Sequence, residues 1–275
     1  MAIKKDKFSW YQQQQVEYGA FEGWNQQYNI THGFSSRKGG VSEGCYKSMN
    51  LGFASKDDEK LVNENFHRFT KALGIQKDNL VLSDQTHETN IRVVSEQDTG
   101  SGMIKPKTYT GIDGLITNVP GIPLMTFHAD CTPLFYVDPQ QKVIGVAHAG
   151  WRGAFSGMAS KMVQAMKEVY HCRPENIQVG IGPSIGKCCF LIRRDVYKHV
   201  KIFPKYVTRI SKVNEEQWRL SLESVHENFL RLENIPEDNI WKSNRCTCCE
   251  EDKFFSHRRM GENRGNHAAV MQLNQ

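Results

Sequence analysis

The chain has 275 residues, of which 39% are hydrophobic and 24% charged, the composition of an ordinary globular protein with a sizeable core. Its formal net charge of +5 is mild, and no long basic stripe stands out among its 30 acidic residues, which fits an anionic substrate and argues against nucleic-acid binding. No run of about 18 apolar residues occurs, so we expect no membrane-spanning helix and no membrane partner.

The eight cysteines are expected to be thiols. The opening MAIKKDKFSW has basic residues but lacks the apolar stretch of a signal peptide, which indicates a cytoplasmic protein. In a reducing compartment most such cysteines are buried packing residues, and a few bind metal or act in catalysis. They are Cys45, Cys131, Cys172, Cys188, Cys189, Cys246, Cys248 and Cys249.

The first predicted helix covers residues 57–73, where acidic residues open DDEKLVNENFHRFTKAL, an apolar stripe follows, and Gly74 can end the helix. A cluster of strands follows, rich in Val, Ile, Leu and Phe and separated by short turn signals. These strands are predicted in NLVLSDQTH, NIRVV, GLITN, PLMTFHADC, PLFYVD and KVIGVAHAG.

A second helix is predicted over residues 154–170, because apolar residues recur there at helical spacing. They are Phe155, Met158, Met162, Met166 and Val169, and we expect the methionines in the core. Further on, NIQVGIGPSIG predicts a buried strand, LSLESVHENFLRL a helix and AAVMQL a closing strand. Strands and helices do not alternate strictly, which favours one α+β domain over residues 1–275.

Reactive side chains gather in the stretch FHADCTPLFYVDPQQKVIGVAHAGWRG. Its DPQQ segment suits a type I turn, so PLFYVD and KVIGVAHAG are predicted to form an antiparallel hairpin. If Asp138 faces Gln141, Cys131 lies opposite His148, with Cβ atoms about 5 Å apart. A slip of one residue would place Thr132 there instead.

Such a pair can share a metal ion, and a catalytic zinc needs about three protein ligands with a fourth position left open. The third ligand is His87 or His128, and we favour His87 because the spacing from Cys131 turns His128 to the opposite face of a strand. Alternatively, Cys131 is the nucleophile and His148 the base of a metal-free cysteine hydrolase. The chain contains no HxH pair, which argues against an ordinary multicopper oxidase, although two histidines and a thiolate can take up Cu²⁺.

Two further segments suggest anion contacts. The loop SSRKGG places Arg37 before Gly39 and Gly40, whose backbone amides could face an anion. In AHAGWRG, Arg152 lies at the predicted start of the second helix, where free amides and the helix dipole favour negative charge.

The C-terminal third adds two more candidate sites. FFSHRR predicts a strand that runs into Arg258 and Arg259, which are further anion contacts. CTCC at residues 246–249 could join KCC at residues 187–189 in a closed structural zinc site. The spacing differs from that of paired CxxC knuckles, so we favour clustered buried cysteines there.

Together, these motifs resemble the laccase-domain family, also called the multicopper polyphenol oxidoreductases and reassigned as purine nucleoside phosphorylases. The segments that carry the resemblance follow one another over most of the chain: THGFSSRKGGVS, SMNLGF, QTH, HADCTPLFYVD, AHAGWRG, IGPSIGKCCF, CTCC and FFSHRR. The resemblance implies a single α+β domain of layered helices and mixed sheets, with zinc bound by His87, Cys131 and His148.

The resemblance also implies phosphorolysis of adenosine, inosine and methylthioadenosine to the free base and ribose 1-phosphate, with adenosine deamination beside it. The partners are then purine nucleosides and inorganic phosphate, and we expect a monomer or a weak homodimer. Several residues match family positions that line one cleft: Arg37 in the SSRKGG loop, and Asn50, Arg152 and Arg258 in other segments. We add Asp130, with Asn50, as a candidate contact for the ribose.

The chain departs from the family pattern at two places. Asn266 stands where the resemblance predicts an arginine, and Arg264 comes two residues earlier. Leu191 replaces the glutamate that is usual after CCF. Both departures concern the contacts with the substrate rather than the metal ligands.

Overall fold

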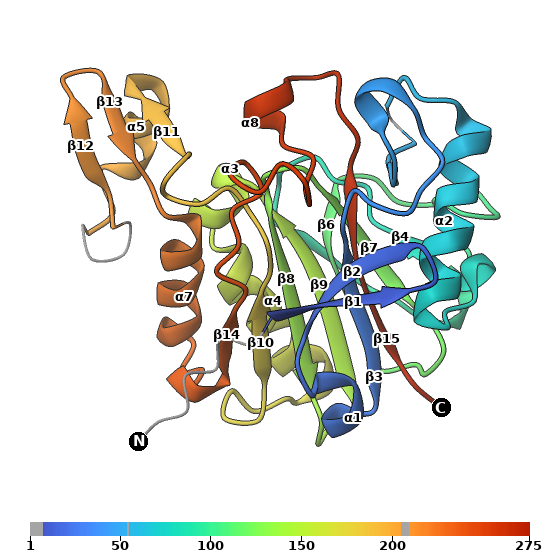
Figure 1. The fold of residues 1–275 in the computed structure, drawn as a ribbon. Helices are drawn as coiled ribbons and strands as arrows, with labels where there is room; N and C mark the ends of the chain where they lie inside the picture. The colour runs from blue at the N-terminus through green and yellow to red at the C-terminus, as the bar shows by residue number, and fades with distance from the viewer. Residues whose placement is uncertain (1–7, 54, 205–208) are drawn as a thin grey trace.

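The computed structural model describes residues 8–53, 55–204 and 209–275, and arranges them in four layers (Figure 1). Two six-stranded sheets share a core in the middle, and helices cover the outer face of each sheet. This arrangement confirms the predicted fold class, an α+β chain of helices layered on mixed sheets. The opening segment 1–7, where we expect no signal peptide, lies outside the described residues.

The first sheet has the strand order β1-β2-β3-β15-β7-β4, so the predicted closing strand of the chain is a central strand. β15 is antiparallel to both of its neighbours, β3 and β7. The first three strands were not predicted, because their short sequences mix apolar and polar residues without a clear alternation. The bounds are β1 Phe8–Gln13, β2 Val16–Phe21, β3 Ile30–Ser35, β4 Val81–Leu82, β7 Leu124–His128 and β15 His267–Leu273.

The second sheet has the order β14-β10-β8-β9-β6-β5. Its central strands β8 and β9 are buried along their whole length, as their continuous apolar sequences predict. The outer pairs β10–β14 and β5–β6 are parallel. The bounds are β5 Asn90–Val93, β6 Ile112–Thr117, β8 Thr132–Asp138, β9 Val143–Ala149, β10 Gln178–Ile181 and β14 Ile240–Lys242.

A small third sheet, with the order β11-β13-β12, projects beyond the end of α7 (Figure 1). Its strands are β11 Leu191–Arg193, β12 Ser211–Asn214 and β13 Gln217–Arg219. The α-helices are α1 Trp24–Tyr28, α2 Glu59–Leu73, α3 Trp151–Phe155, α4 Met158–Tyr170, α5 Arg194–Val200, α7 Leu222–Leu232 and α8 His257–Met260. Short 3₁₀ helices cover Gly44–Tyr46, Lys77–Asn79, Glu96–Asp98 and Glu237–Asn239. Within the described ranges, no helix has the length and apolar character needed to cross a membrane.

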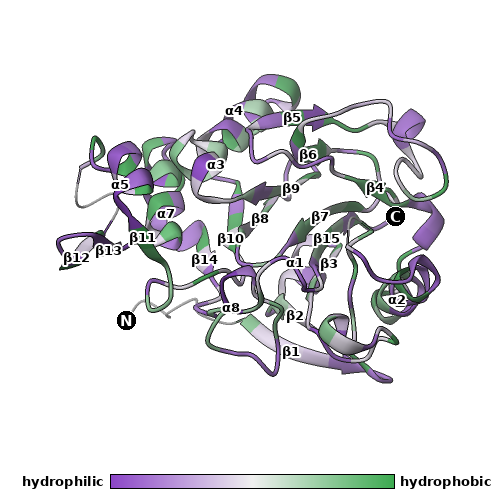
Figure 2. Ribbon diagram, turned by 90° about the horizontal axis from the view of Figure 1, so that it is seen from above, coloured by the Kyte–Doolittle hydropathy of each residue, from purple (hydrophilic) through white to green (hydrophobic). Residues whose placement is uncertain are grey.

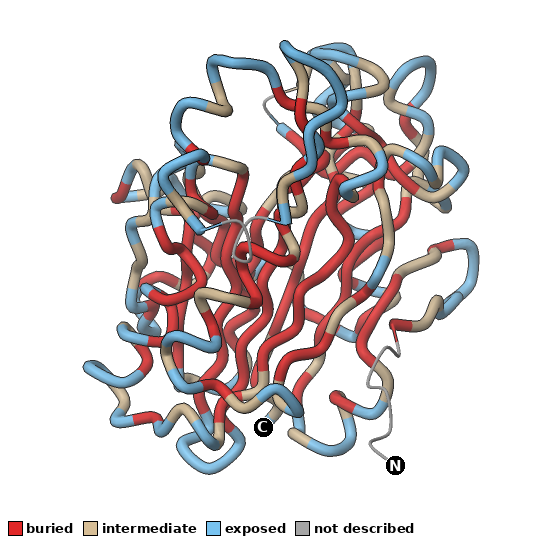
Figure 3. The backbone as a smooth tube through the Cα atoms, turned by 90° about the vertical axis from the view of Figure 1, so that its left-hand side faces the viewer, coloured by how far each residue is buried: buried red, intermediate tan, exposed pale blue. Residues whose placement is uncertain are grey.

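Apolar side chains fill the space between each pair of layers. Phe34 of the first sheet and Phe135 of the second belong to the core between the sheets. α4 and α7 cover the second sheet through Met162 and Leu230, and α2 covers the first sheet through Phe66. The two groups of helices lie on opposite sides of the sheets in Figure 2, and the central strands form the buried interior in Figure 3. Burial of each such side chain contributes about 1.5–3 kcal/mol.

α2 begins and ends where its sequence provides caps. Asp58 accepts a hydrogen bond from the backbone N–H of Lys60, and Gly74 ends the helix in the left-handed conformation. The helix therefore starts at Glu59, two residues later than predicted, and its C-terminal end is as predicted.

The helix predicted over residues 154–170 is broken into α3 and α4. Gly157 lies between them with a φ of 78°, which cannot continue a right-handed helix. The three methionines of α4 are buried as predicted, but Val169 is 42% exposed and does not belong to the apolar stripe.

Buried neutral histidines are expected to make the fold acid-sensitive. Burial lowers the pKa of His32, His226 and His267 to about 3. In the unfolded chain the pKa of a histidine is about 6.5, so between pH 6.5 and 3 the unfolded chain binds more protons than the folded one. The free energy of unfolding present above pH 6.5 is therefore lost as the pH falls towards 3. We expect His226→Leu to lower the pH slope of the urea unfolding free energy by about one proton, or about 1.4 kcal/mol per pH unit. An unchanged slope between pH 6 and 4 would contradict this assignment.

Candidate active site

His148 is fixed by a carboxylate on the neighbouring strand. β6 and β9 pair with Gly114 facing Ala147, which brings Asp113 opposite His148. The Nδ1 atom of the His148 ring lies 2.7 Å from Asp113 Oδ1, and both side chains are buried. This hydrogen bond orients the ring and leaves Nε2 to bind a metal or a proton.

The predicted register of the β8–β9 hairpin is wrong by two residues. Asp138 faces Val143 rather than Gln141, and Pro133 faces His148. The turn is longer than predicted because Asp138 Oδ1 accepts hydrogen bonds from two backbone N–H groups within it, those of Gln140 and Gln141.

This error leaves the predicted pair intact. Side chains on a strand alternate with a period of two, so a shift of two residues keeps each side chain on its face. Cys131, directly before β8, therefore still lies near His148, as a diagonal neighbour rather than a direct one.

His87 comes from a loop that Asp113 also organises. The Asp113 carboxylate accepts hydrogen bonds from the backbone N–H groups of Thr86, His87 and Glu88. His87 has a φ of 64° and an exposed side chain, and its Nε2 lies 3.9 Å from Cys131 Sγ. A side chain at Gly150 would bring its Cβ to 3.0 Å from both Cys131 Sγ and His87 Cδ2, so glycine leaves room for these two side chains.

The structure thus brings His87, Cys131 and His148 together, with their ligand atoms all within 4.8 Å of one another. His128, the alternative third ligand, does not belong to this group, although its ring centroid lies 5.4 Å from that of His148. Its ring nitrogens contact Thr126 Oγ1 at 2.8 Å and the Cys131 carbonyl at 3.2 Å.

Cys131 and His148 shift each other's ionisation in opposite directions. Burial raises the pKa of the Cys131 thiol, but His148 and His87 outweigh it and lower that pKa to about 6. Burial lowers the pKa of His148, yet the Cys131 thiolate and Asp113 raise it to about 9. Near neutral pH, the pair therefore carries a thiolate and an imidazolium, and metal binding would release the His148 proton.

The three side chains line a cavity of about 1550 Å³. Trp151 and Phe190 contribute aromatic surface to its lining. The cavity is far larger than a metal ion alone needs. Its lining combines charged and aromatic side chains, which suits an organic substrate.

Asp130 connects the loop that carries Cys131 to the wall of the cavity. Its carboxylate accepts hydrogen bonds from Thr247 Oγ1 at 2.6 Å, Ser256 Oγ at 2.9 Å and the Arg258 backbone N–H at 2.6 Å. Its φ of 83° turns the chain sharply just before Cys131. Both carboxylate oxygens are thus bonded to the protein, and a direct contact with ribose stays a prediction.

Asp130→Ala is expected to destabilise the fold by about 3 kcal/mol, because it leaves buried donors without an acceptor and places alanine at a positive φ. Asp130→Asn is expected to cost less, since asparagine tolerates this backbone conformation and keeps one carbonyl oxygen. Urea unfolding of both variants measures the difference, and equal losses would contradict the role of the backbone conformation.

Four arginines line the cavity: Arg152, Arg193, Arg258 and Arg264. Arg152 lies in α3 with its guanidinium 4.4 Å from the centre of the Trp151 ring. Arg258 donates to the Cys189 carbonyl at 3.1 Å and the Leu191 carbonyl at 3.0 Å. Arg264 donates to Asn266 Oδ1 at 2.7 Å, and its buried Nε finds no acceptor among the described residues. The last two come from α8 and the loop after it, at the top of Figure 1.

The SSRKGG loop lies outside this lining. Arg37 donates to the Lys47 and Glu251 carbonyls, and side chains at Gly39 or Gly40 would collide with neighbouring backbone atoms at 2.2 and 2.1 Å. These contacts give the loop a structural role, and its contact with an anion stays a prediction.

Asn50 is fully buried at a junction between loops. It donates to Ser55 and Asp57 and accepts hydrogen bonds from the backbone N–H groups of Gly52 and Asn266. Asn50 therefore holds the segment that carries Asn266 and does not line the cavity in the described structure. A contact between Asn50 and ribose likewise stays a prediction.

Residues 31–274 match the family model described as multi-copper polyphenol oxidoreductase laccase. The chain belongs to this family. Purine nucleoside phosphorylase YlmD of Geobacillus stearothermophilus is 35% identical over 230 residues, which cover 82% of this chain and 84% of the relative. Adenosine deaminase RL5 of an unknown prokaryotic organism is 31% identical over 240 residues, which cover 84% of this chain and 90% of the relative.

The crystal structure of YlmD from Geobacillus stearothermophilus has the same fold. It aligns with a TM-score of 0.91 and 30% identity, covering 98% of this chain and 100% of that chain. The resemblance of this chain to the multi-copper polyphenol oxidoreductase laccase family, predicted from its motifs, is thus confirmed over nearly its whole length.

The residue that the sequence prediction missed in this laccase-family chain is Asp113. It lies in GIDG, at the second position of β6, and nothing in its local sequence marks it as functional. Only the pairing of β6 with β9 reveals that it contacts His148 and the His87 loop.

Proposed function

We propose that this chain is a purine nucleoside phosphorylase whose reaction takes place beside a zinc ion held by His87, Cys131 and His148. The observation that supports this most directly is the grouping of these three ligands at the wall of a cavity of about 1550 Å³ lined by arginines and aromatic rings. A relative named purine nucleoside phosphorylase supports this reaction, and one named adenosine deaminase supports a purine nucleoside as the substrate.

The ligand set fits zinc. Two imidazoles and one thiolate are the ligand types zinc takes at catalytic sites, with one position left for substrate or water. An imidazole nitrogen and a thiolate sulfur on a tetrahedral zinc lie about 3.6 Å apart, and His87 Nε2 lies 3.9 Å from Cys131 Sγ. When bound, zinc supplies a Lewis acid and lowers the pKa of a bound water to near neutrality, which suits adenosine deamination as a second activity.

Phosphorolysis transfers the ribosyl group from a purine nitrogen to a phosphate oxygen. Positive charge develops on the ribose and negative charge on the leaving base, so the site must position a phosphate anion against the sugar. We assign this role to the guanidinium groups of Arg152, Arg258 and Arg264, all at the cavity wall. Trp151 and Phe190 offer apolar ring surface on which a purine can stack.

Separation of the products from adenosine tests this proposal. Zinc-loaded protein is incubated with adenosine, with and without inorganic phosphate, and the bases and nucleosides are resolved by chromatography. Adenine formed only with phosphate, together with ribose 1-phosphate, is the expected result, and inosine in both samples would show deamination. Absence of all three products from metal-replete protein would overturn the proposal.

The same geometry supports a second candidate, a metal-free cysteine hydrolase. Cys131, His148 and Asp113 form a thiolate, an imidazolium and an orienting carboxylate, as in nucleophile triads. Excess chelator separates the two functions, because it abolishes a zinc-dependent activity and spares a thiol-dependent one. His87 favours zinc, since the triad has no need of a second imidazole beside the thiolate.

Whether this site binds copper depends on which metal is supplied to the protein. Two imidazoles and a thiolate bind Cu²⁺ more tightly than Zn²⁺, so oxidase activity is expected only in protein loaded with copper. Metal analysis of protein purified without added copper, followed by an assay of phenol oxidation, tests this expectation.

A further inference from the structure

We propose that Cys188, Cys189, Cys246 and Cys249 form a second, structural zinc site that fastens two loops at the wall of the cavity. The sulfur atoms of these four cysteines all lie within 4.8 Å of one another. The proposal concerns a different group of ligands from His87, Cys131 and His148, and it does not depend on the reaction that the chain catalyses.

The spacing of the sulfur atoms suits one tetrahedral ion. Zinc binds thiolates at about 2.3 Å, so two of its sulfur ligands lie about 3.8 Å apart at the tetrahedral angle and never more than about 4.6 Å apart. Cys249 Sγ lies 3.4 Å from Cys188 Sγ and 3.3 Å from Cys189 Sγ, and small movements would open these contacts to the tetrahedral distance. Four sulfurs gathered around one point exceed what a single disulfide would need.

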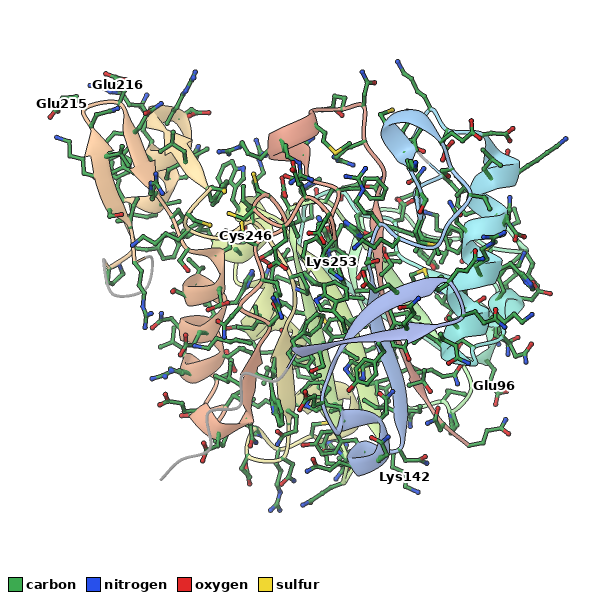
Figure 4. All side chains as sticks on the ribbon, in the orientation of Figure 1. Glu96, Lys142, Glu215, Glu216, Cys246 and Lys253 are labelled. Atoms are coloured by element: carbon green, nitrogen blue, oxygen red, sulfur yellow. The ribbon has the colours of Figure 1, made fainter. Side chains whose placement is uncertain are left out.

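The ligands come from two loops that leave neighbouring strands. Cys188 and Cys189 follow β10, and Cys246 and Cys249 follow β14, which pairs with β10 in parallel. Cys246 is labelled in Figure 4, near the upper end of α7. An ion shared by the two loops would close a link between segments about 60 residues apart in the chain.

Backbone groups are also arranged for sulfur ligands. The N–H of Gly186 donates to Cys246 Sγ at 3.2 Å. A side chain at Gly186 would bring its Cβ to 3.1 Å from Cys188 Sγ and 3.3 Å from Cys246 Sγ, so glycine allows both sulfurs to approach. Hydrogen bonds of this kind stabilise thiolates bound to a metal.

Three arginines contact the backbone of the segments that carry the cluster. Four thiolates and Zn²⁺ carry a net charge of −2, which requires compensation at a partly buried site. Arg219 donates to the Cys188 carbonyl at 2.7 Å, Arg258 to the Cys189 carbonyl at 3.1 Å and Arg259 to the Cys248 carbonyl at 2.6 Å. The positive groups are thus already held against the segments that carry the ligands.

Exposure argues against the alternative of simple packing. Cys188 and Cys249 are exposed and the other two are half-buried, so the predicted cluster of buried cysteines is wrong in this respect. Four thiols at the surface bury little apolar area in each other's company, whereas a bound ion gives their convergence a physical reason. Because Arg258 contacts the Cys189 and Leu191 carbonyls, the ion would also fix one wall of the cavity.

The number of zinc ions per chain tests this proposal. Elemental analysis of purified protein is expected to give two zinc ions per chain, and Cys249→Ser is expected to remove one of them. His148→Ala is expected to remove the other, independently. Cys248→Ser is the matched control, because this half-buried neighbour lies outside the group of four and should keep both ions.

Two further measurements keep the proposal falsifiable where Cys249→Ser fails to fold. Cys188→Ser changes an exposed ligand, and it should also remove one zinc ion. Co²⁺ in place of zinc in the His148→Ala protein should give the intense sulfur-to-metal charge-transfer bands of a tetrahedral tetrathiolate. A wild-type protein with one zinc ion that only His148→Ala removes, or with iron in place of the second zinc, would overturn the proposal. If Cys249→Ser lowers the zinc content and His148→Ala does not, the zinc site proposed at His87, Cys131 and His148 is contradicted, and the second zinc site is supported.

Discussion

His148→Ala is expected to lower the rate of adenosine phosphorolysis by about a thousandfold or more. The substitution removes one of the three proposed zinc ligands, and it leaves the buried Asp113 carboxylate without its imidazole partner. Charge stabilisation by a catalytic metal is worth several kcal/mol, and about 4 kcal/mol corresponds to this factor. The measurement is kcat/KM for adenosine at saturating phosphate, together with zinc content at the same protein concentration.

His67→Ala serves as the matched control, since this exposed histidine of α2 lies outside the metal group and the cavity lining. Its kcat/KM and zinc content should equal those of the wild type. If His148→Ala kept its activity while losing one zinc ion, that zinc would have no part in the reaction. If it lost its activity and kept the zinc content of the wild type, His148 would act as a base rather than as a ligand, and the cysteine hydrolase would gain support.

The sequence could predict the grouping of the candidate metal ligands because this grouping tolerates an error in register. A hairpin between PLFYVD and KVIGVAHAG was enough to place Cys131 and His148 on one face. The error of two residues changed direct opposition into a diagonal contact, which a metal ion spans equally well. A slip of one residue would have sent the two side chains to opposite faces.

Long-range pairing explains what the sequence could not predict. The motif with Asp113 indicates no function until the pairing of β6 with β9 places Asp113 opposite His148. Likewise, β15 is a central strand only because it pairs with strands more than a hundred residues away in the chain. Asn50 and Arg37 are a different case. Their motifs predict contacts with the substrate, which stay predictions, and the structure adds hydrogen bonds that hold the surrounding loops.

The arginines illustrate how the fold can preserve a charge when the sequence pattern shifts. Asn266 replaces the arginine expected from the resemblance, and it accepts a hydrogen bond from Arg264 at the cavity wall. Burial lowers the pKa of Arg264, while Asp130 opposes that shift. The guanidinium stays charged at any physiological pH, because the ordinary arginine pKa lies far above neutrality. We therefore place Arg264, rather than residue 266, among the phosphate-binding groups of the proposed function.

Asp113→Asn is expected to weaken zinc binding by about 10–100-fold, the usual effect of removing a carboxylate that orients a metal-bound histidine. Burial raises the pKa of the Asp113 carboxyl, but the His148 ring and the N–H groups of the His87 loop lower it below its ordinary value, so the native group is ionised. An amide at this position presents a donor where the structure has only donors facing it, namely His148 Nδ1 and the backbone N–H groups of Thr86, His87 and Glu88.

Two proposed zinc ligands would then be disturbed by one substitution, since Asp113 holds both the His148 ring and the loop of His87. Zinc affinity of the variant is measured by competition with a chromophoric chelator, and kcat is measured at saturating zinc. The kcat should recover at least in part when zinc is in excess, which distinguishes a residue that positions ligands from one that touches the substrate. Asp98→Asn is the control, because Asp98 is equally a buried carboxylate, but it accepts its hydrogen bonds from Arg92 and the Ser95 N–H rather than from His148 and the loop of His87. Unfolding should become easier in both variants, and zinc affinity should fall only in Asp113→Asn; a similar fall in both would mean that general loss of stability, rather than orientation of His148 and His87, weakens the site.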